Sequence, residues 1–149
     1  MRLRVHHLLC VPLFTGHGYS EAFTKHMTEK VCQLKQGCEV HLTTGPDEIC
    51  SACPNLSADG HSCMLDTDHV KTKDEQLLSL LGLQTVKAYD SSKLWEMVKE
   101  RMKREDFEAS CKNCEWYKMG LCGYEAYSRN IQQLIKNRRN ETYSAENAK

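Results

Sequence analysis

The sequence lacks net charge and lacks a long hydrophobic run. Twenty lysine and arginine residues balance twenty aspartate and glutamate residues in a chain of 149. Such a chain has no broad electrostatic field that would attract nucleic acid or an anionic membrane. No apolar stretch approaches the roughly 18 residues that a membrane-spanning helix needs. We therefore expect a soluble protein with neither a nucleic-acid nor a membrane partner.

The N-terminal segment lacks the full pattern of a secretory signal. Arg2 and Arg4 precede an apolar run, but two histidines interrupt the run and no small-residue cleavage site follows it. Cysteine, by contrast, is abundant, with nine residues. The odd count and the two C-x-x-C pairs favour metal or redox chemistry in a reducing compartment over disulfides. The sequence thus predicts a cytoplasmic protein.

Helical patterns predominate along the chain. The segment from Cys38 to Thr44 alternates and predicts a short strand, whereas residues 1–14 fit either a strand or a buried helical turn. Capping signals and apolar periodicity predict helices over residues 20–36, 72–82, 90–102 and 124–139. We expect a mostly α (α+β) single domain at 1–139, with about five helices, one or two short strands and two cysteine-rich loops. Residues 140–149 are predicted to form a disordered tail.

Two cysteine clusters share one pattern. Each has a C-x-x-C pair followed by a third cysteine about ten residues later. Thiolates two residues apart can turn toward one ion, because the turn between them offers backbone N–H groups to the sulfurs. Four thiols suffice for one tetrahedral zinc or one 4Fe-4S cluster. The predicted ligands are Cys50, Cys53 and Cys63 in the first triplet, and Cys111, Cys114 and Cys122 in the second.

The number of thiols leaves two partitions open. If Cys10 joins, seven thiols could form one four-cysteine site and one three-cysteine site whose fourth position is open to water or substrate, which would imply an enzyme. Alternatively, the C-x-x-C thiols form one structural site, and Cys63 and Cys122 are spare. His61 could replace a cysteine, although an exposed loop histidine is the favoured interpretation.

Ligand type does not separate iron-sulfur from zinc, since both accept thiolates. Neither common ferredoxin spacing is present, which weakens the hypothesis of a simple electron carrier. Structural zinc in a binding protein is the corresponding alternative.

A third motif is the run from His6 to Cys10. On a helix, His6 and Cys10 lie one turn apart, so they could bind a metal together or form a nucleophilic pair, and His7 is a second candidate base. The alternative is a buried segment whose histidines form hydrogen bonds with the backbone. A further cysteine, Cys32, is predicted to pack beside the apolar face of its helix.

Together these motifs resemble a known family, the domain-of-unknown-function family 1284, whose short bacterial and archaeal members are suspected of binding iron-sulfur. The resemblance covers about residues 2–125 and implies iron-sulfur binding. It is carried by His-His-Leu-Leu-Cys at 6–10, Gly-x-Gly-Tyr-Ser at 16–20, Gly-Pro-Asp-x-Ile-Cys-x-x-Cys-Pro at 45–54, Cys-x-x-Cys-x-Trp at 111–116 and Gly-x-Cys at 120–122. The positions that it carries over are His6, His7, Cys10 and the six cysteines of the triplets.

Three hypotheses follow. The leading one is an iron-sulfur protein, most simply with a 4Fe-4S cluster, whose loops at 46–66 and 108–123 converge on one cluster or two. Its role would be electron transfer with a redox partner protein, or cluster-dependent chemistry on a small-molecule substrate. The second hypothesis is a zinc-stabilised interaction module without catalysis. The third is a cysteine-dependent enzyme that uses Cys10 with His6 or His7.

Overall fold

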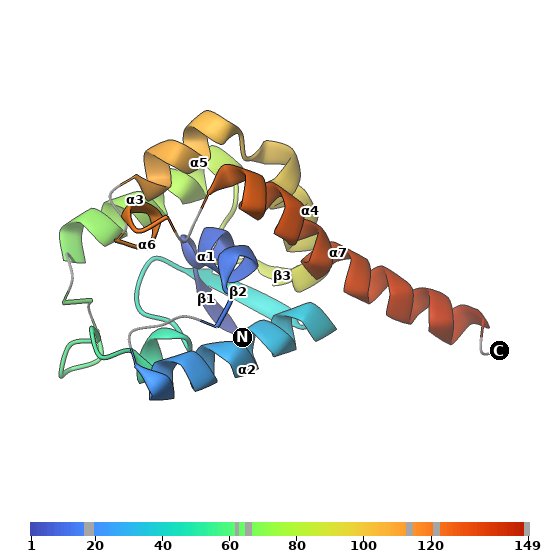
Figure 1. The fold of residues 1–149 in the computed structure, drawn as a ribbon, viewed down its shortest axis with the longest axis horizontal. Coiled ribbons are helices and arrows are strands. Elements are labelled where there is room, and N and C mark those ends of the chain that lie inside the picture. The colour runs from blue at the N-terminus through green and yellow to red at the C-terminus, as the bar shows by residue number, and fades with distance from the viewer. Residues whose placement is uncertain (17–19, 62, 65–66, 113–114, 121–122, 148–149) are drawn as a thin grey trace.

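Helices make up most of the protein (Figure 1). The computed structural model describes residues 1–16, 20–61, 63–64, 67–112, 115–120 and 123–147. The predicted mostly α (α+β) fold is confirmed. In chain order the helices are α1 (His7–Leu13), α2 (Glu21–Gln36), α3 (Thr67–Leu81), α4 (Ser91–Arg101), α5 (Arg104–Cys111), α6 (Glu115–Lys118) and α7 (Tyr124–Asn147), and a 3-10 turn, η1, spans Cys50–Ala52.

A small sheet of three strands lies among these helices, where the sequence predicted one or two strands. It consists of β1 (Arg2–Arg4), β2 (Glu39–Thr43) and β3 (Ala88–Asp90), in the order β1-β2-β3. Strand β2 pairs in parallel with β1 and antiparallel with β3. The N-terminal segment is therefore both predicted alternatives in succession, a strand and then a helix. Strand β3 is too short for alternation to reveal it.

Strand β1 is at one edge of the sheet, and the loop after β2 covers its outer side. The backbone N–H of Arg2 donates to Oε2 of Glu48 (2.5 Å), and the N–H of Arg4 donates to Oδ2 of Asp47 (2.6 Å). From α2, the ring of His26 donates to the carbonyl oxygen of Glu48 (2.6 Å). The loop is thus fixed between β1 and α2, directly beside the start of α1.

The hydrophobic core joins α1, α4 and α7. Helix α7 packs against α1, α2 and α4. Trp95 of α4 is fully buried, and its indole N–H donates to the carbonyl oxygen of Leu8 in α1 (3.3 Å). This packing fixes the helix that carries the N-terminal histidines.

Helix α2 follows its prediction closely. The hydroxyl of Ser20 accepts the N–H of Phe23 (3.1 Å) as an N-cap, and Gly37 ends the helix with φ of 98°. The predicted packing of Cys32 is wrong, because this residue is exposed. It lies one position beyond Val31, outside the buried stripe.

Two other helix boundaries differ from the sequence prediction. Helix α3 begins at Thr67, so Thr72 is an exposed interior residue and not an N-cap. The capping-box pattern arises there because polar residues recur on a solvated helix face. Helix α7 continues to Asn147, beyond the predicted end near Arg139. The domain limits of 1–139 stay a prediction.

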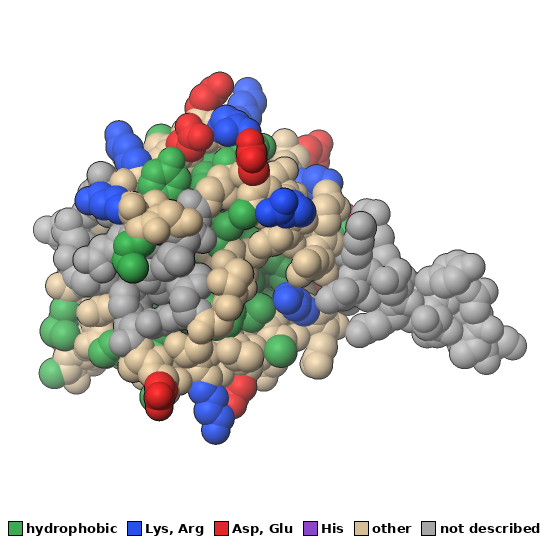
Figure 2. All heavy atoms as spheres, in the orientation of Figure 1, with side chains coloured by type: hydrophobic (Ala, Val, Ile, Leu, Met, Phe, Trp, Pro, Cys, Tyr) green, Lys and Arg blue, Asp and Glu red, His purple; other side chains and the backbone are tan. Residues whose placement is uncertain are grey.

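The surface carries charges of both signs. On the face shown in Figure 2, lysine and arginine side chains lie among aspartate and glutamate side chains. Each helix in the described part of the chain is too short or too polar to cross a membrane. A hollow of about 290 Å³ is lined by Gly37–Glu39 and Ala88–Asp90, at the opposite end of β2 from the Asp47 loop.

Candidate functional site

His6 is held by a buried carboxylate of α3. Its backbone N–H donates to Oδ1 of Asp74 (2.9 Å), and its ring Nδ1 lies 2.8 Å from the same oxygen. The other oxygen of Asp74 accepts Nε–H of Arg4 (2.5 Å). Asp74 and Arg4 are both buried. The buried Arg4 guanidinium therefore supplies the positive charge that balances the carboxylate of Asp74.

The electrostatics of this group fix its protonation. Burial, followed by the positive charge of His7, lowers the pKa of His6 to about 4, although Asp74 opposes the change. Burial alone would raise the pKa of Asp74, but the contacts with His6 and Arg4 lower it below the ordinary value. At neutral pH the carboxylate is ionised and only accepts, so Nδ1 of His6 carries the ring proton.

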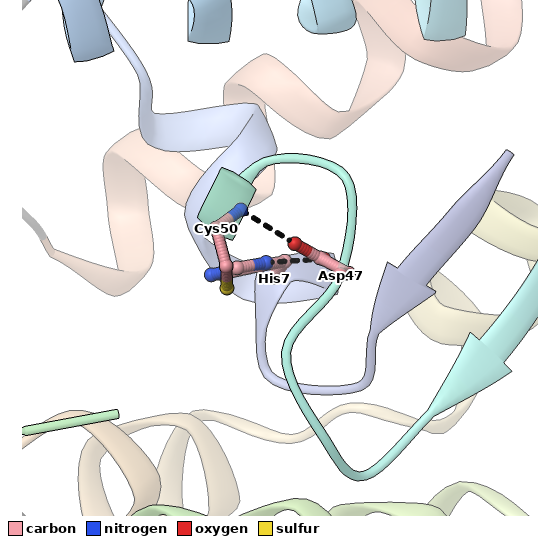
Figure 3. Close-up of side chains that lie close together, drawn as sticks. All are labelled: His7, Asp47 and Cys50. Atoms are coloured by element: carbon pink, nitrogen blue, oxygen red, sulfur yellow. Dashed lines mark hydrogen bonds and ion pairs between the residues drawn. The ribbon is translucent and has the colours of Figure 1, made fainter. Parts of the chain in front are cut away.

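His7 is held by a different carboxylate, from the loop after β2. Its Nδ1 lies 2.6 Å from Oδ2 of Asp47, whose side chain is fully buried. The other oxygen, Oδ1, accepts the N–H of Cys50 (3.0 Å). One ligand atom from each of His7, Asp47 and Cys50 lies within 4.8 Å of the other two. Figure 3 shows the sulfur of Cys50 beside the His7 ring.

The pKa values of Asp47 and Cys50 are both shifted in this group. Burial would raise the pKa of Asp47, but His7 and the hydrogen bonds from His7, Arg4 and Cys50 lower it well below the ordinary range. Burial, and then the negative charge of Asp47, raise the pKa of the Cys50 thiol to about 12. Without a bound cation, the site therefore holds a carboxylate beside a neutral thiol. A cation would reverse the state of the thiol, because a coordinating thiol is deprotonated.

The first cysteine triplet lies on one short loop. The N–H of Cys53 donates to the carbonyl of Cys50 (2.9 Å), which closes the turn of the C-x-x-C pair. The N–H of Asn55 donates to Sγ of Cys53 (3.4 Å). An isolated antiparallel bridge between Leu56 and Cys63 brings the third cysteine back to this turn.

The thiols of Cys53 and Cys63 interact. Burial is the main cause that raises the pKa of Cys53, and the charge of Cys63 adds to it. Cys50, Cys53 and Cys63 are all half-buried. The loop therefore carries three half-buried cysteines, and among the described residues Cys50 is the one whose sulfur groups with His7 and Asp47 within 4.8 Å.

The other predicted residues are distributed as follows. Cys10 is half-buried on α1, one turn after His6 and His7. Its predicted action with either histidine stays a prediction. Cys111 is buried at the end of α5, whereas Cys114 and Cys122 lie outside the described residues. His61 is exposed, which agrees with the favoured interpretation of a loop histidine.

A buried tyrosine, Tyr127, interacts electrostatically with Cys111. The hydroxyl of Tyr127 has no hydrogen-bond partner within the described part of the molecule. Burial raises its pKa, and the charges of Tyr124 and Cys111 add to the change. An acceptor close to Cys111 would satisfy this hydroxyl.

Sequence reasoning missed the two carboxylates and Arg4. Asp74 precedes Leu77, Leu78 and Leu81 at helical spacing, and a charged residue on an apolar stripe is a signal that was available. Asp47 stands three residues before Cys50, which is also visible in the sequence. Neither signal identifies the histidine that each carboxylate binds.

A family model described as a protein of unknown function, DUF1284, matches residues 18–120. The chain belongs to this family. The part of the chain that DUF1284 matches includes both carboxylates and the whole first triplet, but begins after His6 and His7. No curated protein and no solved structure matches the chain.

Proposed function

We propose that the protein binds an iron-sulfur cluster through Cys50, Cys53 and Cys63, and that it serves in electron transfer or in cluster-dependent chemistry on a small substrate. The observation that carries this proposal is the loop at 50–64, where a closed C-x-x-C turn and the backbone bridge at Cys63 place three cysteines on one short folded segment. Thiolates are the ligands that hold iron-sulfur clusters.

The donor set fits such a group in two further respects. An N–H already donates to the sulfur of Cys53, and hydrogen bonds of this kind stabilise a metal-bound thiolate and tune its reduction potential. The three thiols are half-buried, so a cluster could enter from the surface and still be partly shielded from water. When bound, a cluster supplies one-electron transfer or a Lewis-acidic iron.

The remaining cysteines of the proposal are Cys10, Cys111, Cys114 and Cys122, as ligands of the same centre or of a second one. Among the described residues the Tyr127 hydroxyl has no hydrogen-bond partner, which supports an acceptor near Cys111, since a thiolate or sulfide there would accept a hydrogen bond from it. The proposed partner is a redox protein or a small-molecule substrate, in the cytoplasm.

The test is anaerobic purification, followed by visible absorption at about 400 nm and analysis of iron and acid-labile sulfide. We expect a coloured protein containing both elements, and loss of both in Cys53→Ala and Cys63→Ala. Cys32→Ala is the matched control, because Cys32 is an exposed cysteine on α2. A colourless protein with stoichiometric zinc would overturn the iron-sulfur proposal.

Zinc is the second candidate, and the presence of His7 beside Cys50 favours it, because three cysteines and one histidine form a common structural zinc site. This alternative describes an interaction module without catalysis. It predicts that a chelator unfolds the loop at 50–64 and that the protein has no redox signal.

A further inference from the structure

We infer that His7 is the non-cysteine ligand of the metal centre at the first triplet, with Asp47 as the carboxylate that orients its ring. This inference rests on the proposed function. It assigns the fourth position beside Cys50, Cys53 and Cys63 to a nitrogen of α1.

The tautomer of His7 follows from its contact with Asp47. The carboxylate is ionised, accepts two backbone N–H groups and has a fully buried side chain, so it can only accept from the ring. Nδ1 of His7 therefore carries the proton, at 2.6 Å from Oδ2. In the neutral ring Nε2 then holds the lone pair, which is the form of imidazole that binds metals.

Cys50 lies within reach of the same ion as His7. The Cys50 sulfur, a ring nitrogen of His7 and an oxygen of Asp47 lie within 4.8 Å of one another (Figure 3). A histidine that donates one ring N–H to a carboxylate and offers the other nitrogen to a metal is the usual arrangement in metal sites. The His7 side chain is 13% exposed, so the ring is fixed but reachable.

The neighbouring histidine argues against a merely structural role for His7. His6 also donates Nδ1–H to a buried carboxylate, but that carboxylate accepts a second hydrogen bond from the charged side chain of Arg4. No arginine or lysine among the described residues forms a side-chain ion pair with Asp47. A cation bound by His7 and Cys50 would supply the positive charge that Arg4 supplies to Asp74.

The experiment compares wild type with His7→Cys, His61→Ala and His41→Ala. Each protein is purified anaerobically or reconstituted with ferrous iron and sulfide, its iron and sulfide are counted, and nitrogen coupling is measured by pulsed electron paramagnetic resonance of the reduced cluster. If zinc is found instead, X-ray absorption at the zinc edge replaces the resonance measurement.

We expect imidazole nitrogen coupling in wild type and in His41→Ala, a control for an exposed histidine. His7→Cys should keep the metal and lose the coupling. Its reduction potential should become more negative, since a thiolate replaces a neutral imidazole. A metal-loaded wild type with sulfur ligands alone, or a coupling that persists in His7→Cys and disappears in His61→Ala, would overturn the assignment of His7 and leave the proposed function standing. Absence of any bound metal would overturn both.

Asp47→Asn tests the positioning role. We expect metal affinity, measured as the chelator concentration that removes half of the metal, to fall about tenfold or more, while the nitrogen coupling remains. Asp59→Asn, at an exposed acidic residue of the same loop, should leave this concentration unchanged. An unchanged affinity in Asp47→Asn would remove Asp47 from the site.

Discussion

His6 and His7 are adjacent in the sequence, yet their surroundings differ in one decisive respect. The carboxylate partner of His6 also binds Arg4, whereas the carboxylate partner of His7 also accepts the N–H of Cys50. The two rings lie 4.6 Å apart between their centroids, so their general environment is nearly the same. The first pair is electrostatically complete within the protein. The second pair ends at a thiol that a metal can bind.

This difference separates a purely structural histidine pair from one that can also take part in metal binding. The pair of His6 and Asp74 ties β1 and α1 to α3 through groups that need no further partner. The pair of His7 and Asp47 fixes the cysteine loop against the same segment, and the second ring nitrogen of His7 has no hydrogen bond with the described residues. Four predictions test this separation.

Asp74→Asn should have the largest effect on stability. It leaves the buried Arg4 guanidinium without its counter-charge, and breaking a buried ion pair typically costs about 3–5 kcal/mol. The measurement is denaturant unfolding of the metal-free protein at pH 7, with the exposed Asp59→Asn as control. A loss below about 1 kcal/mol would contradict the role assigned to Arg4 and Asp74.

The second prediction concerns pH, again for the metal-free protein. The pKa of His6 is lowered from 6.5 to about 4, mainly by burial. Below pH 6.5 the unfolded chain binds a proton at His6 that the folded protein does not bind. Stability should therefore fall between pH 6.5 and 4, by at most about 3 kcal/mol.

His6→Asn should flatten this dependence, because the amide can still donate to Asp74 but does not titrate in that range. His41→Asn, at an exposed histidine, should retain the full dependence. The pKa values of Asp47 and Asp74 are also lowered, so their contributions are lost only at lower pH, as the pH falls through their folded values. An unchanged slope in His6→Asn would show that another group is responsible.

Asp47→Asn should destabilise the metal-free protein less than Asp74→Asn, by about 1–3 kcal/mol. It weakens the acceptor of three hydrogen bonds but leaves no arginine without a partner. Urea unfolding of the two variants side by side gives the comparison. Equal losses would mean that the two histidine pairs are equivalent in stability.

Glu48→Gln should have the smallest effect, below about 1 kcal/mol. Its side chain is 43% exposed, and the amide oxygen of glutamine can still accept the N–H of Arg2. The variant also weakens the ion pair with Lys30. Thermal unfolding measures this change. A larger loss of stability would mean that Glu48, and not Asp47, makes the main contact that holds the loop on β1.

Sequence patterns were sufficient to predict the elements whose structure depends on local residues alone. The apolar stripe and the serine cap of α2 are local signals, and the helix formed as they predict. The C-x-x-C turn at Cys50 and Cys53 is local too. The contacts of the histidines are not, since Asp74 lies 68 residues from His6 and Asp47 lies 40 residues from His7.

Arg4 is a second case in which tertiary contacts, and not the local sequence, decide the environment of a residue. Strand alternation places Arg2 and Arg4 on the same side of β1, yet Arg2 is exposed and Arg4 is buried. The cause is α3, which brings Asp74 over one of these positions. Only the tertiary arrangement decides which of two identical residues becomes a buried counter-ion.

The carboxylates of Asp47 and Glu48 also cover one edge of the sheet. An edge strand with open N–H groups is a template to which a strand of another molecule can add. Glu48 and Asp47 occupy the outward N–H groups of Arg2 and Arg4, and their negative charges would repel the carbonyl oxygens of an incoming strand. The same loop that carries the first cysteine triplet therefore opposes the addition of a strand at this edge of the sheet.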